Sequence, residues 1–127
     1  MSWDIMLFKT NKQVNVVENI NDDYLELTDF GSALENHFEN IYQDKNYREI
    51  KGKDFTIEFF IDDTPKNNFL LQLKGEKGLF EIIQLAKLKG WQIFDTMLGE
   101  MIDIENPVNN GFSNYKKYVK QITKNEV

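Results

Sequence analysis

Four carboxylates in the last third of the chain are the residues best suited to chemistry. Asp95, Glu100, Asp103 and Glu105 lie in or beside an expected strand, turn and second strand. Grouped carboxylates can bind Mg²⁺ or Ca²⁺ through oxygen or supply a general acid and a general base. No calcium-loop spacing is present and a single hairpin supplies every acid, so we interpret them as structural or solvent-facing residues. A cation site or an acid–base pair is the alternative.

Three other features that often carry chemistry have simpler explanations. Asp62 and Asp63 are adjacent, and neighbours on a strand point to opposite faces, so a role in a turn is favoured over a catalytic pair. His37 is the only histidine, and it is expected to pack at the boundary of a helix because no nucleophile or orienting acid accompanies it. Gly75 and Gly78 precede a helix, where backbone N–H groups can bind an anion. The phosphate-loop and dinucleotide spacings are absent, however, which favours a turn with positive φ.

Composition and charge exclude several classes of protein. The chain has 127 residues, a net charge of −6 and no cysteine, which removes disulfides, thiolate nucleophiles and cysteine-ligated metals. Residues 1–63 hold 14 acidic and 6 basic side chains, whereas residues 64–127 hold 7 acidic and 9 basic ones. The acidic half would repel a phosphate backbone, so we expect no nucleic-acid partner. It would attract a basic protein, with a merely solubilising surface as the alternative.

The first residues and the lengths of the apolar runs bear on the cellular location of the protein. The first residues lack the pattern of a signal peptide, and no apolar run approaches the roughly 18 residues that span a bilayer. We therefore expect a cytoplasmic protein without a membrane partner or a cofactor, as a monomer or homodimer.

The length fits a single domain over residues 1–127. The lysines of the last helix are interpreted as a solvated face or as contacts with the acidic half.

Hydrophobic periodicity predicts an α+β fold. Alternating apolar residues predict five strands, at residues 3–8, 54–62, 69–74, 91–95 and 100–104. Helical spacing predicts three helices, at residues 29–42, 79–89 and 113–123. Residues 9–27 are expected to form a long loop. The first six elements follow the order βαββαβ, which is typical of a ferredoxin-like antiparallel sheet, here with an added C-terminal β-strand and α-helix.

Such a sheet would have two helices on one face and a partly apolar surface on the other. Five apolar side chains would lie on that second face: Met6, Phe8, Phe60, Leu70 and Phe94. An apolar surface of this size is usually covered. We expect the C-terminal helix to cover it through Tyr115, Tyr118 and Val119, with a second subunit or a partner protein as the alternative.

Three segments carry a resemblance to known sequences. The start MSWDIMLF, the middle REIKGKDFTIEFFIDD and the end GWQIFDTMLGEMIDIENPVNNGF resemble an uncharacterised family of small bacterial proteins that begin MSWDI. The chain also has the general look of the immunity proteins of bacterial toxin systems, which bind and block a toxin. The resemblance rests on core and turn residues, so it implies a shared fold more than a shared activity.

These observations favour a non-enzymatic protein-binding module, possibly an immunity protein that neutralises a toxin. Its candidate contacts with a basic partner are the acids Asp62, Asp63, Asp95, Glu100 and Asp103. The alternative is a small-ligand-binding or regulatory ferredoxin-like domain that acts as a dimer. A metal-dependent hydrolase using Asp95 and Asp103 is a third hypothesis, and a cation titration would test it.

Overall fold

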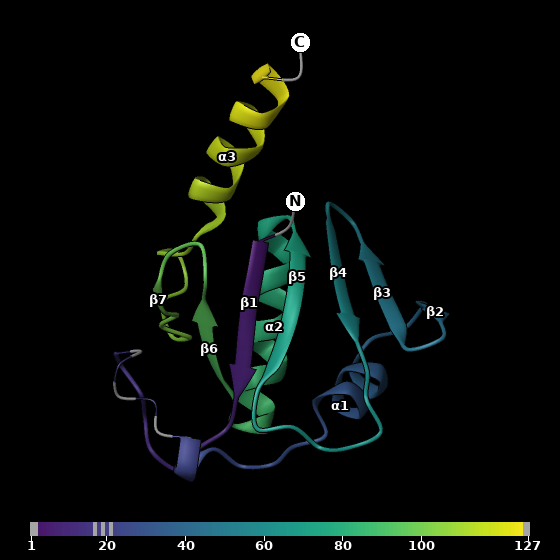
Figure 1. Cartoon of the computed structure of the whole chain (residues 1–127), viewed down its shortest axis with the longest axis vertical. Coiled ribbons are helices and arrows are strands. Elements are labelled where there is room, and N and C mark those ends of the chain that lie inside the picture. Colours follow the sequence, from purple (N-terminus) through teal and green to yellow (C-terminus); the bar gives the residue numbers. More distant parts are fainter. Residues whose placement is uncertain (1–2, 17, 19, 21, 126–127) are drawn as a thin grey trace.

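The structure is a computed structural model that describes residues 3–16, 18, 20 and 22–125. It shows an α+β fold with a single antiparallel sheet in the strand order β2-β3-β4-β5-β1-β6-β7 (Figure 1). The strands are β1 (Trp3–Phe8), β2 (Ile41–Asp44), β3 (Tyr47–Gly52), β4 (Phe55–Phe60), β5 (Phe69–Lys74), β6 (Gln92–Asp95) and β7 (Glu100–Met101). The helices are η2 (Asp22–Tyr24, a 3₁₀ turn), α1 (Phe30–His37), α2 (Glu76–Lys89) and α3 (Phe112–Asn125).

The clearest sequence patterns form the elements that they predict. β1 and β5 have the expected bounds, and β4 is shorter than expected by one residue at its start and two at its end. β5 alternates buried and less buried side chains throughout, as a sheet with one covered face requires. β1 and β4 do so over most of their length, with Phe8 at the end of β1 buried as well. α2 ends at Gly90, whose φ of 74° is left-handed and whose N–H bonds to the Ala86 carbonyl. Gly75 has the positive φ expected of the turn before α2, at 101°.

The expected helix over residues 29–42 is wrong beyond His37. Phe38 is extended and Asn40 has a positive φ of 56°, so the chain leaves the helix and enters β2. Ile41 continues the helical spacing of the apolar residues, so the sequence pattern predicted a helix where β2 begins. β2 pairs with β3 through a turn at Lys45 and Asn46, a hairpin that the sequence reading missed.

This hairpin makes the sheet larger than a plain ferredoxin-like one. The strands β4, β5, β1 and β6 are neighbours in the sheet, as the βαββαβ order expects. β2 and β3 extend the sheet at one edge, and β7 extends it at the other. The ferredoxin-like description is therefore wrong for the sheet as a whole, because α1 leads into two extra strands before β4. The added C-terminal strand and helix are present, although β7 has only two residues.

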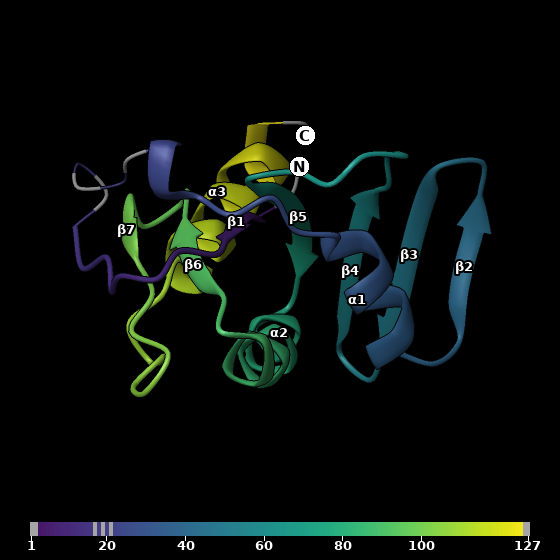
Figure 2. The same ribbon diagram turned by 90° about the horizontal axis from the view of Figure 1, so that it is seen from below.

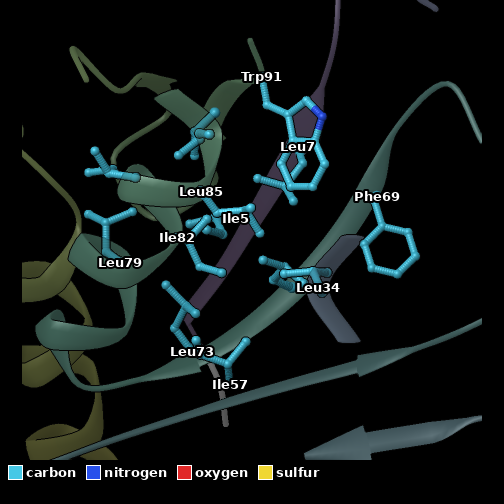
Figure 3. Close-up of a cluster of buried hydrophobic side chains, with 14 of the residues drawn as sticks. Ile5, Leu7, Leu34, Ile57, Phe69, Leu73, Leu79, Ile82, Leu85 and Trp91 are labelled. Carbon is cyan, nitrogen blue, oxygen red and sulfur yellow. The ribbon is translucent and has the colours of Figure 1, made fainter. Parts of the chain in front are cut away.

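One core lies between the sheet and the helices α1 and α2, which sit on the same side of it (Figure 2). The inward face of β1 contributes Trp3, Ile5 and Leu7, all fully buried. Figure 3 shows Leu79, Ile82 and Leu85 of α2 and Leu34 of α1 packed against residues of the strands. We call this covered side the inner face and the opposite side the open face.

The C-terminal helix does not take the place expected for it. The rings of Phe112 and Tyr115, in its first turn, contact Trp3 of the inner face at centroid distances of 5.7 and 6.5 Å. From there α3 extends beyond the end of the sheet instead of lying on the open face (Figure 1). Tyr118 and Val119 remain 41% and 37% exposed. Among the described residues, none of the helices has the length and apolar character needed to cross a membrane.

Candidate functional site: the open face of the sheet

Asp95, the strongest acidic candidate from the sequence, is a buried structural residue. Its side chain is fully buried on the inner face, opposite Ile5. One carboxylate oxygen, Oδ1, accepts the Trp3 Nε1–H at 2.9 Å and the backbone N–H groups of Met97 and Leu98 at 3.0 and 3.2 Å. Oδ2 accepts the Gly111 N–H at 2.7 Å. Four donors occupy this carboxylate, so Asp95 is not part of an exposed acidic surface.

The acids that follow Asp95 do not converge with it. Glu100 is exposed on β7, and Asp103 is exposed and accepts the Glu105 N–H at 3.0 Å, which closes a turn. In the described part of the chain, no group of three or more histidine and acidic side chains is arranged to hold a metal ion. The geometry therefore gives no support to a metal-dependent hydrolase built on Asp95 and Asp103.

Asp62 and Asp63 follow the end of β4. Asp62 forms an ion pair with Lys66 at 2.9 Å and accepts the Asp63 N–H at 2.6 Å. The hydrogen bond from Lys66 lowers the pKa of Asp62, and the N–H of Asp63 adds to the effect. Asp63 is exposed in the turn. Asp62 is exposed as well, and it also lines the groove on the open face that is described below.

The remaining sequence candidates have local roles. His37 is the last residue of α1, and its ring lies edge-on to Phe38 at 4.9 Å. Gly78 lies inside α2, where an added Cβ would make an ordinary contact with Ile57 of β4 at 3.4 Å, so the packing of α2 on the sheet leaves room for a small side chain. Neither position forms a binding site.

A row of apolar side chains crosses the open face. Cross-strand partners share a face of a sheet, and the observed register pairs Tyr47 with Phe60, Leu70 with Met6, Met6 with Phe94, and Phe94 with Met101. We call these six residues the apolar row. Phe60 and Leu70, at its centre, are 60% and 43% exposed. Phe8, which the sequence placed on this face, is only 2% exposed and does not belong to the accessible surface.

A second row, two residues further along the strands, is acidic. The register aligns Glu49 with Glu58, Glu58 with Gln72, and Gln72 with Asp4. We call Glu49, Glu58 and Asp4 the acidic row. Like charges directly opposite one another on a sheet are destabilising by a few tenths of a kcal/mol to about 1 kcal/mol. The pair of Glu49 and Glu58 is therefore a position where an added cation would stabilise the structure.

Neighbouring side chains partly offset this repulsion. The Tyr47 hydroxyl donates to Glu49 Oε2 at 2.8 Å, and Lys51 lies 3.4 Å from the same carboxylate. Lys74 lies 3.5 Å from Glu58. The hydrogen bond from Tyr47 is the largest influence that lowers the pKa of Glu49. Burial, the bond to Glu49 and the charge of Glu58 raise the pKa of Tyr47 to about 12.

A groove opens where the two rows meet β4 and β5. The ladder between these strands runs from Thr56 and Lys74 to Glu58 and Gln72, and beyond it the strands spread apart (Figure 1). The resulting groove has a volume of about 470 Å³. Its lining combines the apolar Phe60, Leu70 and Ile61 with the carboxylates of Glu58 and Asp62 and with several amides.

Aromatic side chains pack on the inner face where β4 and β5 spread apart. Phe69 of β5 stacks on Phe30 of α1 at 5.7 Å and lies edge-on to Phe59 of β4 at 5.8 Å. The sequence predicted four of the six members of the apolar row and missed Tyr47 and Met101. Tyr47 and Glu49 of the acidic row belong to the hairpin that the sequence pattern did not reveal.

Comparison of the chain with protein-family models, with curated proteins and with solved structures finds no match. The chemistry of the open face is therefore the feature of the chain that bears on its function.

Proposed function

We propose that this protein is a non-enzymatic binding module that takes a basic protein on the open face of its sheet. The observation that carries this proposal is the apolar row beside the acidic row, with the groove between β4 and β5 at their centre. Exposed apolar side chains flanked by charge are typical of protein interfaces. The facing carboxylates of Glu49 and Glu58 favour a partner that brings lysine or arginine.

Neutralisation of a bacterial toxin is the biological role that best fits such a module. The supporting features are the small size, the net charge of −6 and the resemblance to immunity proteins. An inhibitor of this kind needs no catalytic group, and Asp95, the best placed acid for catalysis, has its carboxylate filled by four N–H donors. The open face, in contrast to the carboxylate of Asp95, is accessible to a partner protein.

The test is capture of proteins from native lysate with four variants of the full chain. Phe60→Asp and Glu58→Gln are expected to lose the partner, because the first places a charge in the apolar row and the second removes a charge from the acidic row. Leu88→Asp and Glu105→Gln are the matched controls, since both positions are exposed and lie outside the open face. Co-expression of the captured protein then shows whether it is toxic and whether this chain suppresses the toxicity.

Three results would count against the proposal. The first is a partner retained equally by all four variants, which would assign binding to another surface. The second is an acidic captured protein, and the third is a failure to capture any protein in stoichiometric amount. A partner that depends on Phe60 and Glu58 and suppresses growth when expressed alone would support both the module and the immunity role.

A small-ligand-binding domain is the second candidate, and the groove is the observation that favours it. Its volume of about 470 Å³ lies within the range of small-molecule sites. A thermal-shift screen of metabolites against the wild type and Phe60→Asp separates the two candidates. A compound that raises the melting temperature of the wild type alone would favour the ligand-binding role.

A further inference from the structure

α3 is an amphipathic helix whose apolar stripe is packed at its start and more exposed further along. Helical spacing places Phe112, Tyr115, Tyr118 and Val119 along one side. The first turn packs on Trp3, while Tyr118 and Val119 lie further along the helix and are 41% and 37% exposed. The other side carries Lys117 and Lys120, while Lys116 flanks the stripe with its Nζ 5.0 Å from the centroid of the Phe112 ring.

The start of α3 is fixed to the inner face of its own chain. Gly111 donates its N–H to the buried carboxylate of Asp95 at 2.7 Å. Asn110 donates to Glu76 Oε2 at 2.9 Å and to the Pro107 carbonyl at 2.7 Å, and its own Oδ1 accepts the Phe112 N–H at 3.0 Å. From these bonds α3 extends beyond the end of the sheet, and in the structure it does not lie on the open face of its own chain (Figure 1).

Charge separates the helix from the rest of the chain. Residues 1–111 hold 20 acidic and 11 basic side chains, a net charge of −9, whereas residues 112–127 hold one acid and four lysines, a net charge of +3. The segment that carries Tyr118 is thus basic and the rest of the chain is acidic. On the open face itself, Asp4, Glu49 and Glu58 outnumber Lys51 and Lys74. Opposite charges of this kind favour the association of two copies and guide their encounter.

We propose that α3 of one copy docks on the open face of a second copy, with Tyr118 against the apolar row, in a reciprocal two-fold dimer. The dimer goes beyond the proposed function, since it covers the face when no partner is bound. A helix rises 1.5 Å per residue, so the ten residues beyond the anchored turn cover about 15 Å. This length matches roughly three strands at about 4.8 Å spacing.

The expected dimer is specific but weak. Two reciprocal contacts of this size bury on the order of 1,000 Å² in total, which is the lower limit for a specific interface. We expect a dissociation constant in the micromolar range, on the order of 10 µM. Exchange of the same element between two copies uses the same contact twice, as two-fold symmetry requires.

Sedimentation velocity of the full chain between about 5 and 500 µM tests the dimer. Tyr118→Asp on α3 and Leu70→Asp on the sheet are each expected to raise the dissociation constant at least about tenfold. Gln121→Asp, on the polar side of α3, and Leu88→Asp, at an exposed position of α2, carry the same new charge and are expected to leave it unchanged. Thermal unfolding checks that every variant folds, and Phe60→Ser replaces Leu70→Asp if that chain does not.

A mixing experiment distinguishes helix exchange from other dimers. A homodimer of either variant has no intact contact, but an equimolar mixture of Tyr118→Asp and Leu70→Asp chains can form one intact α3–sheet contact. The mixture is therefore expected to dimerise more strongly than either variant alone. A mixture that dimerises more strongly than either variant alone supports the exchange of α3 between two copies.

Other outcomes would overturn the proposal. A monomer at every concentration excludes the dimer. A dimer sensitive to Leu70→Asp but indifferent to Tyr118→Asp assigns the contact to two sheets packed face to face. A monomer that binds vesicles of phosphatidylcholine and phosphatidylglycerol through Tyr118 assigns the apolar stripe to a lipid surface instead.

Discussion

Replacement of Asp95 by asparagine is the sharpest test of the interpretation of that residue. The two side chains have nearly the same shape, so the change alters hydrogen bonding and charge without creating a cavity. If the amide oxygen keeps the donors of Trp3, Met97 and Leu98, the amide nitrogen faces the N–H of Gly111, which is a second donor. One charge-assisted bond is lost, a buried donor is left without an acceptor, and three bonds become weaker.

The expected loss of stability follows from these bonds. A hydrogen bond to a charged group contributes about 1.5–3 kcal/mol, and an unsatisfied buried donor costs about 1–3 kcal/mol. Together with the weaker remaining bonds, we expect Asp95→Asn to lower the free energy of unfolding by about 3–5 kcal/mol. For a chain of this length that corresponds to a melting temperature lower by roughly 10–15 °C.

Urea denaturation followed by tryptophan fluorescence measures this change, since Trp3 itself donates to Asp95. Asp103→Asn is the control, because Asp103 is exposed and accepts a single backbone N–H; we expect it to cost less than about 1 kcal/mol. Equal effects of the two substitutions, or an effect of Asp95→Asn below about 1 kcal/mol, would refute the reasoning about the buried carboxylate.

Three further predictions concern other parts of the chain. The pKa of Tyr47 is raised to about 12, so the contribution of this residue to stability is complete below pH 10 and is lost as the pH rises from 10 towards 12. Absorbance at alkaline pH follows the ionisation of Tyr47, and Glu49→Gln is expected to bring this pKa back towards 10. Gly111→Ala is expected to cost about 2–3 kcal/mol in urea denaturation, because the new Cβ would lie 2.6 Å from the buried carboxylate oxygen. Arg48→Met is expected to cost about 2–3 kcal/mol, since it removes the 2.6 Å ion pair with the half-buried Glu35.

Each of these predictions has a contrary outcome. An unchanged Tyr47 pKa in Glu49→Gln would show that burial and the charge of Glu58 set this pKa without Glu49. A neutral Gly111→Ala would mean that the neighbouring turn shifts easily, and Gly99→Ala, at a φ of 73° with open space around it, measures the cost of backbone strain alone. A neutral Arg48→Met would mean that packing of the methionine compensates for the lost ion pair.

The sequence could predict the elements whose signals are local. β1, β5 and the end of α2 follow from alternation, from spacing and from a glycine in the left-handed conformation, all of which lie within a few residues. The β2–β3 hairpin could not be recognised in this way, because Ile41 fits both the end of a helix and the start of a strand. The helix stops at Phe38, where the backbone becomes extended.

The open face was predictable in part, and the role of Asp95 was not. The alternation of β4 and β5 places Phe60 and Leu70 opposite the core, whatever the order of the strands. The donors to Asp95 come from β1, from the turn after β6 and from the residue before α3, and the strand register brings them together. α3 begins directly after Gly111 and extends beyond the end of the sheet, so the expectation that it covers the open face was wrong.

The position of β1 between β5 and β6 has a consequence for biosynthesis. β1 leaves the ribosome before the other strands of this sheet, yet its partners are residues 69–73 and 92–95. At about 5–20 residues per second, translation leaves Trp3, Ile5 and Leu7 without a neighbouring strand for several seconds. Contacts so distant in sequence also slow folding after release. We therefore expect the nascent chain to depend on chaperones that shield apolar segments, and expect that dependence to fall in a circular permutant that begins at β5.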